Sequence, residues 1–433
     1  MSEQPQFTVS VYQNEFLPEG AGEVNAIVTV TSAGPTAAAP GARAAQVVMV
    51  DCSGSMEYPG TKMSAARQAT KAAIDAIRDG VPFAVVAGTH VARMVFPGTE
   101  YLVPADASTR AAAKAAVDRL TSGGGTAIGQ WLTLADRLFT GHGDAIRHAI
   151  LLTDGKDEHE TPEQLDAAIA RCEGRFTCDC RGVGTDWVVA ELRRVATGLL
   201  GTVDIVADPG RLAADFQAMI EGAMGKAVAD VRLRLWSPQG AAVKFVKQVA
   251  PLVLDVTGKR VASGPLAGDY PTGAWGAESR DYHVCVTVRA GSVGDEMLAA
   301  RVSLVSVDGS GQSAVLGQGL VRAVWTDDAA LSTKLNRQVA HYTGQAELAD
   351  AIQSGLEARK NGDLDTATRK LGRAVQLAAE SGNEGTTKLL RKVVEVEDPA
   401  TGTVRLRNRV DDADEMALDT RSTKTVRMGK GDA

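Results

Sequence analysis

The chain has 433 residues, of which 44% are hydrophobic and 23% are charged, and it carries a formal net charge of −7. Its length exceeds one ordinary domain, and its composition excludes a wholly disordered chain. The negative charge excludes a general electrostatic surface for nucleic acid, and no apolar run is long enough to span a membrane. Because residues 1–10 lack a basic segment followed by an apolar one, we expect no signal peptide and a cytoplasmic protein.

Two segments of alternating polarity open the chain, FTVSVYQ at 7–13 and VNAIVTVTS at 24–32. A period of two predicts half-buried antiparallel strands, with Val24 and Val28 on one face and Asn25 on the other. A Pro/Ala/Gly-rich linker, AGPTAAAPGARAA, follows. Residues 1–44 are therefore interpreted as strands and a linker.

Short apolar runs alternate with Ala-rich stretches between residues 45 and 225. The first run, VVMV at 47–50, is unbroken, which suits a strand covered on both faces. The alternation of strands and helices predicts a Rossmann-like α/β domain, that is, a mostly parallel sheet with helices on both faces. Helices are expected near 61–79, 108–120, 127–140, 162–173, 187–198 and 209–224.

The period returns to two between residues 226 and 328, as in DVRLRLW at 230–236. Several such segments separated by Gly-rich turns predict an antiparallel β-sandwich. Residues 1–44 share this texture. We therefore expect the N-terminal strands to pair with the sandwich, so that the α/β domain is an insertion into it.

The last part of the chain is first helical and then polar. Residues 329–397 predict a helical hairpin joined at NGDL, similar to one tetratricopeptide-like pair. Residues 398–433 are polar and of mixed charge, and we expect them to be disordered. Two interpretations of the end, DTRSTKTVRMGKGDA, stay open: a solvated terminus, or a phosphoacceptor tail modified at Thr420, Thr423 or Thr425.

The cysteines suggest a reducing compartment. They number five, an odd count, and they are unevenly spaced, which fits free thiols better than a disulfide framework. Zinc would need four ligands, whereas only Cys172, Cys178 and Cys180 lie close in sequence. We favour small buried hydrophobes at these positions, with a zinc site as the alternative.

Three polar clusters interrupt the α/β region: DCSGS at 51–55, GGGTAIG at 123–129 and TDGKDEH at 153–159. Each is predicted to follow a strand of the sheet, at the carboxyl edge where ligands collect. Carboxylate and hydroxyl oxygens suit a hard cation such as Mg²⁺, which usually keeps some of its waters. The glycines at 123–125 would let their loop approach closely, since glycine has no Cβ.

This pattern resembles the metal-ion-dependent adhesion site of the von Willebrand factor A (VWA) domain, over roughly residues 45–225. The family's five positions map onto Asp51, Ser53 and Ser55 of DxSxS, Thr126 of the second cluster and Asp154 of the third. The resemblance implies a bound Mg²⁺, with Mn²⁺ or Ca²⁺ as alternatives. It also implies that the three hydroxyls touch the metal, that the aspartates act more often through water, and that a partner's carboxylate completes the shell.

Each cluster also has a simpler interpretation. Asp51 to Ser55 could cap the following helix, Thr126 could cap the helix that it begins, and Asp154 with Gly155 could form a plain turn. The joint occurrence of all three clusters favours the metal site. We expect its ligands to lie at a solvent-facing rim.

The residues argue against catalysis. A haloacid-dehalogenase-type site needs a second carboxylate where Ser53 stands, and a nucleophile elbow needs GxSxG. A phosphate loop needs a lysine after its glycines, and none follows Gly123–Gly125. We therefore expect a binding protein and not an enzyme.

The resemblance extends to bacterial cytoplasmic VWA proteins that serve as scaffolds beside Ser/Thr kinases, phosphatases and forkhead-associated (FHA) domains in signalling or stress response. The expected function is metal-dependent capture of an acidic side chain on a protein partner, with no nucleic-acid or membrane partner. The alternative is a client-binding accessory subunit of a AAA+ ATPase of the MoxR or chelatase type. No Walker motif occurs here, so that ATPase would be a separate chain.

Overall fold

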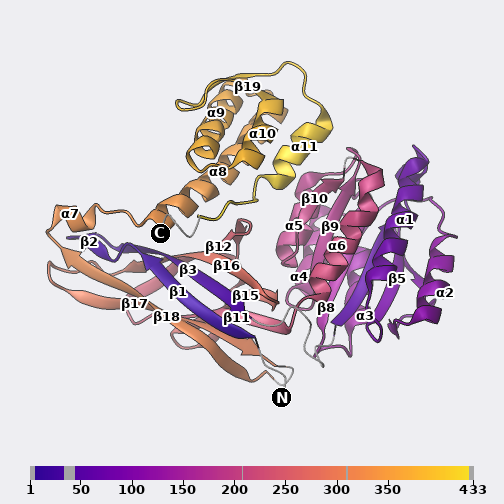
Figure 1. Cartoon of the computed structure of the whole chain (residues 1–433), viewed down its shortest axis with the longest axis horizontal. Helices are drawn as coiled ribbons and strands as arrows, with labels where there is room; N and C mark the ends of the chain where they lie inside the picture. The colour runs from indigo at the N-terminus through magenta and orange to yellow at the C-terminus, as the bar shows by residue number, and fades with distance from the viewer. Residues whose placement is uncertain (1–4, 34–43, 207, 309–310, 429–433) are drawn as a thin grey trace. The chain divides into compact units, whose positions relative to one another are not determined.

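A computed structural model describes residues 5–33, 44–206, 208–308 and 311–428, and these form two compact units. The first, here called the α/β unit, contains described residues between 44 and 229 together with 273–276. The second, the β/helical unit, contains the strands before the insertion and most of the chain after residue 229 (Figure 1). The predicted linker falls largely on residues 34–43, which lie outside the described residues.

The α/β unit is built on a mostly parallel sheet, as predicted. Its parallel strands, in sheet order, are β10 (Val203–Val206), β9 (Thr177–Val183), β8 (Ile146–Thr153), β4 (Ala44–Asp51) and β5 (Pro82–Gly88). Two short strands, β6 (Ala92–Phe96) and β7 (Val103–Pro104), pair with β5 in the antiparallel direction. Neither strand was predicted from the sequence, because neither is long enough to show a period.

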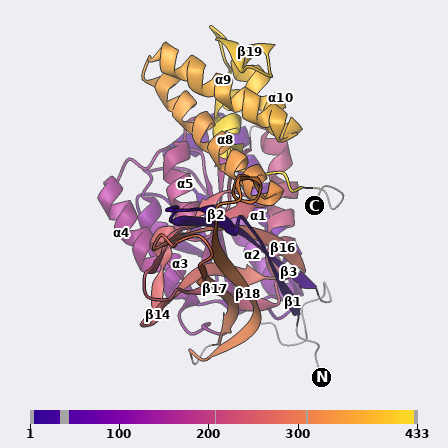
Figure 2. The ribbon, with the colours of Figure 1, turned by 90° about the vertical axis from the view of Figure 1, so that its left-hand side faces the viewer.

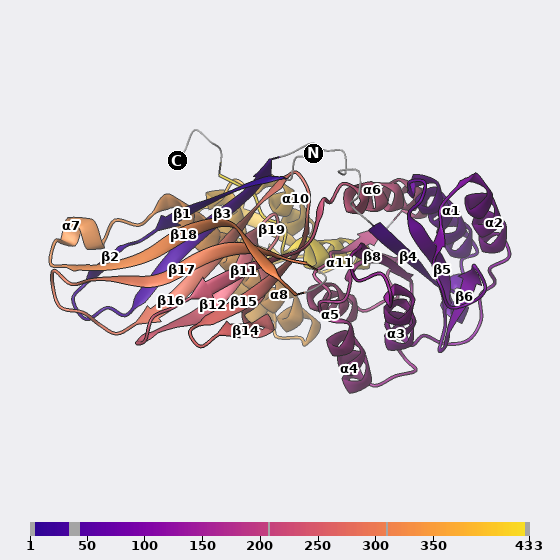
Figure 3. The same ribbon diagram turned by 90° about the horizontal axis from the view of Figure 1, so that it is seen from below.

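Helices cover both faces of this sheet. They are α1 (Thr61–Ala76), α2 (Ala107–Val117), α3 (Ile128–Phe139), α4 (Pro162–Cys172), α5 (Val189–Gly198) and α6 (Leu212–Met224). Figure 3 shows α1 and α6 on one side of the strands and α3, α4 and α5 on the other. All six helices fall where the Ala-rich stretches predicted them.

Burial on both faces explains the unbroken apolar run of β4. All eight of its residues are buried. On one face, Val48 and Val50 belong to a core that also contains Ala69 of α1 and Phe216 of α6. Side chains of α1 and α6 therefore cover this face of the strand, which ends in the buried polar residue Asp51.

The β/helical unit contains two mainly antiparallel sheets. The first consists of β1 (Gln6–Gln13), β3 (Glu23–Ala33), β16 (Glu278–Val288), β12 (Ala241–Ala250) and β13 (Leu254–Asp255). The second consists of β14 (Val261–Gly264), β15 (Ala267–Trp275), β11 (Val228–Trp236), β17 (Glu296–Val307), β18 (Ser313–Thr326) and β2 (Phe16–Pro18). The N-terminal strands thus join both sheets, which confirms the insertion of the α/β domain into a β-sandwich.

The pairing of β3 with β16 shows why the alternating pattern was informative. Val24 and Val28 are fully buried, whereas Asn25 on the other face is partly exposed. Ile27, on the Asn25 face, is nevertheless buried, because it packs in a cluster with Val339 and Tyr342 of helix α8. The helical segment therefore covers part of the sheet that would otherwise face water.

A helical segment follows the sandwich. Its elements are α7 (Ala329–Ser332), α8 (Arg337–Lys360), α9 (Leu364–Glu380), α10 (Glu384–Val393), the hairpin β19 (Val394–Asp398) with β20 (Thr403–Leu406), and α11 (Asp412–Arg421). Helices α8 and α9 form the predicted hairpin around NGDL, and α10 is a third helix that sequence analysis missed (Figure 2). No helix among the described residues has the length and apolar character needed to cross a membrane.

The predicted disorder of residues 398–433 is wrong for the part that the structure describes. Leu418 of α11 is fully buried in one core with Leu371 of α9 and Leu390 of α10. The segment after α11 then lies along the first sheet, where Val253 N donates to Thr423 O at 2.7 Å. Polar composition hid this order, because short buried stretches and side-chain hydrogen bonds to other segments fix it rather than a long apolar run. Residues 429–433 lie outside the described residues.

One of the three proposed phosphoacceptor positions is also inaccessible. Thr420 is 1% exposed, and its hydroxyl donates to Met416 O. Thr425 Oγ1 donates to Val249 O at 2.7 Å. A phosphate on Thr420 would require this segment to leave its place, which disfavours the phosphoacceptor interpretation at that position.

Candidate metal centre

Two of the three polar loops leave neighbouring parallel strands at the same edge of the sheet. Strand β4 ends at Asp51, and β8, which pairs with β4, ends at Thr153. Asp154 therefore emerges beside Asp51. A 3₁₀ turn at Gly54–Glu57 folds the first loop back over these strand ends.

The remaining polar loop, which carries Thr126, does not follow a strand, so that part of the prediction is wrong. It connects helix α2 to helix α3. Backbone hydrogen bonds tie it to the first loop instead: Gly123 N donates to Cys52 O, and Gly54 N donates to Gly124 O, both at 2.8 Å. The hydroxyl of Thr126 is thereby brought to the edge of the sheet by loop-to-loop pairing.

A chain of hydrogen bonds links four of the five predicted ligands. Ser53 Oγ lies 2.9 Å from Ser55 Oγ, and Ser55 Oγ donates to Asp154 Oδ1 at 2.6 Å. Asp51 Oδ1 accepts from Ser53 N at 2.7 Å, and Asp51 Oδ2 accepts from Thr153 Oγ1. Thr153 was not predicted; its position next to Asp154 in the sequence was the available signal.

Four of the five predicted ligands are buried, Asp51 and Asp154 fully and Ser53 and Thr126 nearly so, and the expectation of a solvent-facing rim is therefore wrong for them. Burial raises the pKa of Asp51 to about 6; its hydrogen bonds from Ser53 and Thr153 oppose this rise, and the charge of Asp154 adds to it. Two buried carboxylates side by side are costly unless a positive charge compensates them.

The simpler helix-capping interpretations do not hold. Helix α1 begins at Thr61 behind Gly60, several residues after the serines. The residue preceding α3 is Ala127, and no side chain caps that end. Ser53, Ser55 and Thr126 are therefore held at this place without serving as helix caps.

Two glycines allow the loops to approach each other. A Cβ on Gly155 would lie 3.0 Å from Ser55 Oγ and 3.5 Å from Thr126 Oγ1, so both hydroxyls flank this backbone. A Cβ on Gly125 would overlap the ring of His159, at 1.8 Å from its nearest atom. This close approach is what the predicted role of the glycine run requires.

Two acidic side chains anchor the start of α3 next to Thr126. Asp157 Oδ2 accepts from Ile128 N at 3.2 Å, and Glu160 Oε1 accepts from Gly129 N. Burial, followed by the neighbouring Glu160, raises the pKa of Asp157 to about 9. These carboxyl groups accept from backbone N–H groups at the positive end of α3. They therefore hold the loop that carries them against the start of α3, and neither lines the pocket.

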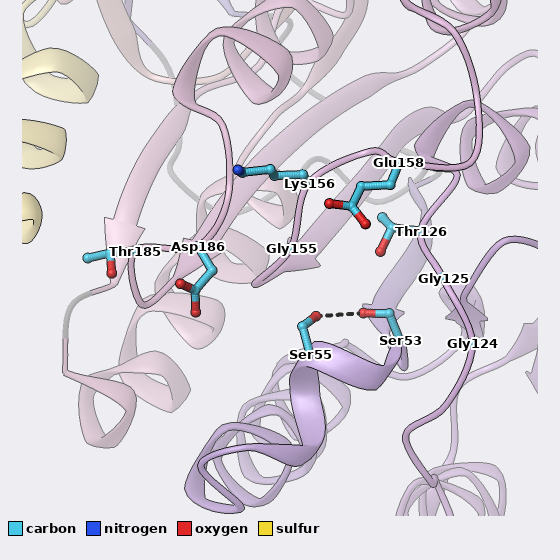
Figure 4. Close-up of a pocket in the computed structure, with 10 residues that line it drawn as sticks. All are labelled: Ser53, Ser55, Gly124, Gly125, Thr126, Gly155, Lys156, Glu158, Thr185 and Asp186. Atoms are coloured by element: carbon cyan, nitrogen blue, oxygen red, sulfur yellow. Dashed lines mark hydrogen bonds between the residues drawn. The ribbon is translucent and has the colours of Figure 1, made fainter. Parts of the chain in front are cut away.

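The hydroxyls of Ser53, Ser55 and Thr126 converge on one pocket of about 400 Å³ (Figure 4). Its other lining residues are Gly124, Gly125, Gly155, Lys156, Glu158, Thr185 and Asp186. Together with Asp51 and Asp154, which contact Ser53 and Ser55, the five predicted ligands offer hydroxyl and carboxylate oxygens, the donor set of a hard divalent cation. The residues present therefore fit the metal that the sequence pattern predicts.

One side chain at the site was missed entirely. Lys62, in the first turn of α1, is 6% exposed, and its Nζ lies 2.6 Å from Asp154 Oδ2. The same Nζ lies 3.1 Å from Asp186 Oδ2. Burial lowers the pKa of Lys62, but its hydrogen bonds to the two aspartates outweigh this and hold the pKa above its usual value.

The cysteines behave as buried hydrophobes. All five are free and buried, and no group of three His, Cys, Asp or Glu side chains within the described residues is arranged to hold a metal. Burial, with the charge of Asp51 next, raises the pKa of Cys52 to about 12. A thiol held protonated in this way is a poor redox sensor.

Comparison with known proteins identifies the fold. Residues 45–205 match the von Willebrand factor type A domain, and residues 376–422 match the von Willebrand factor type A C-terminal domain. The solved structure of a von Willebrand factor type A protein from Catenulispora acidiphila is 56% identical, with a TM-score of 0.94 over 99% of this chain and 98% of that one. The chain belongs to the von Willebrand factor type A family.

More distant matches agree with this assignment. The ArnB paralog VWA2 from Sulfolobus acidocaldarius has a TM-score of 0.58 over 96% of this chain and 98% of that one; at 15% identity the likeness shows the fold alone. An uncharacterised protein of Synechocystis sp. is 27% identical over 215 residues, which are 48% of this chain and 49% of that protein. The chain spans about half the length of the curated relatives it matches.

Proposed function

We propose that this VWA protein captures a protein partner through a divalent cation held by Asp51, Ser53, Ser55, Thr126 and Asp154. The observation that carries the proposal is the convergence of three hydroxyls on one pocket, with two buried carboxylates hydrogen-bonded to Ser53 and Ser55. Mg²⁺ suits these oxygen donors, and Mn²⁺ or Ca²⁺ could replace it. When bound, the cation would supply an open coordination position for a carboxylate oxygen of the partner.

The site's own residues support capture rather than turnover. Ser53 and Ser55 bond to each other, and Ser55 also donates to Asp154, so their hydroxyls are oriented by neighbours that are themselves predicted ligands. Asp51 is fixed by Ser53 N and Thr153. Such a preorganised set of oxygens holds an ion in place. We therefore propose a binding protein without enzymatic activity.

The partner is proposed to present an exposed Asp or Glu side chain. By the resemblance to bacterial cytoplasmic VWA proteins, a Ser/Thr kinase, a phosphatase or an FHA-domain protein in a signalling or stress-response complex is the leading class. The open pocket, with exposed Lys156 and Glu158 beside it, leaves room for a polypeptide loop to reach the hydroxyls.

Thr126→Val tests the proposal, because valine keeps the shape of threonine and removes only the oxygen. The tagged full chain and the variant are used to capture proteins from native lysate, with Mg²⁺ or with EDTA. We expect the unaltered chain to capture its partner in Mg²⁺ but not in EDTA, and the variant to capture it in neither. Thr133→Val, in helix α3, is the matched control and should capture normally.

Capture that survives both EDTA and Thr126→Val would contradict the proposal. Mass spectrometry of the captured proteins then distinguishes the partner classes. A kinase, phosphatase or FHA-domain protein supports the signalling scaffold, whereas a AAA+ ATPase supports the accessory-subunit alternative.

A further inference from the structure

Lys62 lies in the site but does not belong to its set of oxygen ligands. Its Nζ is 2.6 Å from Asp154 Oδ2, and Asp154 is fully buried. Its side chain is 7% exposed, so this ion pair is shielded from solvent and salt. A lysine placed this way has a strong electrostatic effect on anything bound beside Asp154.

The charge balance at the pocket shows what this effect is. Asp51 and Asp154 together bring two negative charges, enough to neutralise a divalent cation. Lys62 cancels one of them. Asp186 also contacts Lys62, but it is 69% exposed and screened by solvent, so it offsets Lys62 only in part and a bound cation keeps some unbalanced positive charge. The other charged side chains lining the pocket, besides Asp186, are Lys156 and Glu158, which are exposed and of opposite sign.

We propose that Lys62 is a built-in cation that weakens the binding of the metal and strengthens the binding of the partner's carboxylate. This inference rests on the proposed function, because it assigns a selectivity role within the same site. A site without Lys62 would be neutral once loaded and would attract a further anion less. With Lys62 in place, the loaded site needs one more negative charge, which an acidic side chain of the partner provides.

Asp186 modulates this role from the surface. It lies on the loop between β9 and α5, lines the pocket, and contacts Lys62 Nζ at 3.1 Å. Its side chain is 69% exposed, so solvent screens its charge and its effect is smaller than that of Asp154. Removing its charge should act in the direction opposite to removing Lys62.

The first measurement is the affinity of the full chain for Mn²⁺ alone, read from the electron paramagnetic resonance of free Mn²⁺. Lys62→Met should bind Mn²⁺ about tenfold more tightly than the unaltered chain, because one unit charge a few ångströms away is worth at least that much. Lys62→Arg keeps the charge and should bind as the unaltered chain does. Lys71→Met, on the same helix and paired with exposed Asp118, is the matched control.

The second measurement uses acetate as the carboxylate probe on the Mn²⁺-loaded protein, read from the water proton relaxation rate. Acetate should bind Lys62→Met about threefold or more weakly than the unaltered chain, although the metal binds more tightly. Asp186→Asn should weaken Mn²⁺ binding by about twofold and strengthen acetate binding. Because Asp186 is exposed, this variant keeps the inference testable if Lys62→Met does not fold.

The outcomes separate the two proposals. If the unaltered chain binds no Mn²⁺, the proposed function fails and this inference fails with it. If the unaltered chain binds Mn²⁺ but Lys62→Met has the same or a lower affinity, only the inference is overturned. The same holds if metal and acetate affinities change in the same direction.

Discussion

Two buried aspartates, one in each unit, have nearly the same partners. Asp154 accepts from the hydroxyl of Ser55 and pairs with Lys62, while Asp281 accepts from the hydroxyl of Tyr342 at 2.5 Å and pairs with Arg427 at 3.2 Å. Each therefore combines a hydroxyl donor with a cation. The difference lies in what surrounds them.

Asp281 is enclosed. Its three contributing segments are strand β16, helix α8 and the stretch after α11, and the ring of Tyr342 packs with Ile27 and Val249 beneath it. Asp154 instead accepts from Ser55, whose hydroxyl lines a pocket of about 400 Å³. A buried aspartate with a hydroxyl donor and a cation thus links segments of the fold where packing encloses it. Next to an open pocket, the same combination forms part of a candidate binding site.

The largest effect is expected from Asp51→Asn at the open site. Asparagine keeps an oxygen for Ser53 N but removes one charge beside the metal, so Mn²⁺ affinity should fall about 100-fold or more. Electron paramagnetic resonance of free Mn²⁺ measures this. Asp118→Asn, on the surface of the same unit, should leave the affinity unchanged. If both variants bound Mn²⁺ with equal affinity, Asp51 would not be a metal ligand.

Asp281→Ala should have the complementary result at the enclosed site. It leaves the buried hydroxyl of Tyr342 without its acceptor and Arg427 without its ion pair, so the free energy of unfolding should fall by about 3 kcal/mol. Urea denaturation measures this, and Mn²⁺ affinity should not change. Asp255→Ala, an exposed aspartate near Lys247, is the control. If Asp281→Ala kept its stability and lost Mn²⁺ binding, Asp281 would belong to the metal site and not to the packing of its unit.

The enclosed region also contains His283, two residues from Asp281, and its protonation should make the stability of the protein depend on pH. Burial, then the charge of Lys247, lowers the pKa of His283 to about 4. The unfolded chain protonates this residue near its ordinary pKa of about 6.5, so protons favour the unfolded state between these values. The free energy of unfolding should therefore fall by about 3 kcal/mol as pH drops from 6.5 to 4.

The variant His283→Gln isolates this contribution. Glutamine can still bond to Asn25, which now contacts His283 Nε2 at 2.9 Å, but it does not titrate in this range. Denaturation at pH 7 and at pH 4.5 should show a smaller acid-induced loss in the variant. An identical loss in both proteins would mean that other groups account for the acid sensitivity.

The smallest effect is expected from Arg427→Ala. The Arg427 side chain is 40% exposed, so its pair with Asp281 is partly screened, and Asp281 keeps Tyr342 as a donor. The loss in unfolding free energy should be about 0.5–1 kcal/mol. Urea denaturation of this variant and of Asp281→Ala compares how much Arg427 and the Tyr342 hydroxyl each contribute to the free energy of unfolding. A loss as large as that of Asp281→Ala would show that the cation dominates.

The sequence was informative where one residue type repeats with a short period. Helix α1 and strand β4 could be predicted from their alanines and aliphatic residues, because both patterns follow directly from burial. Strands β6 and β7 could not, because a strand of two to five residues at a sheet edge contains too few buried positions. The order after residue 398 was not predicted for a related reason, since the buried residues of α11 are only Ala417, Leu418 and Thr420, too few to show a helical period.

The candidate site divides in the same way. Asp51, Ser53 and Ser55 stand within five positions of each other, so a motif could name them, and the structure brings Thr126 and Asp154 to the same place. Lys62 and Asp186 are 124 positions apart, and no local pattern marks a lysine that will be buried beside an aspartate. Ion pairs between distant segments depend on the packing of α1 against the sheet, which sequence periods do not specify.

The insertion also gives the two halves of one sheet very different times of synthesis. Strand β3 pairs with β16, and their residues Thr31 and Ser279 are 248 positions apart. A ribosome adding about 5–20 residues per second needs roughly 12–50 s to cover that distance. Throughout this interval the hairpin of β1 and β3 has an edge without its partner, and every strand of the α/β unit's parallel sheet is made before that partner, β16, is complete. The nascent chain therefore depends on protection of that edge, and slow translation of the insertion lengthens the time in which it can aggregate.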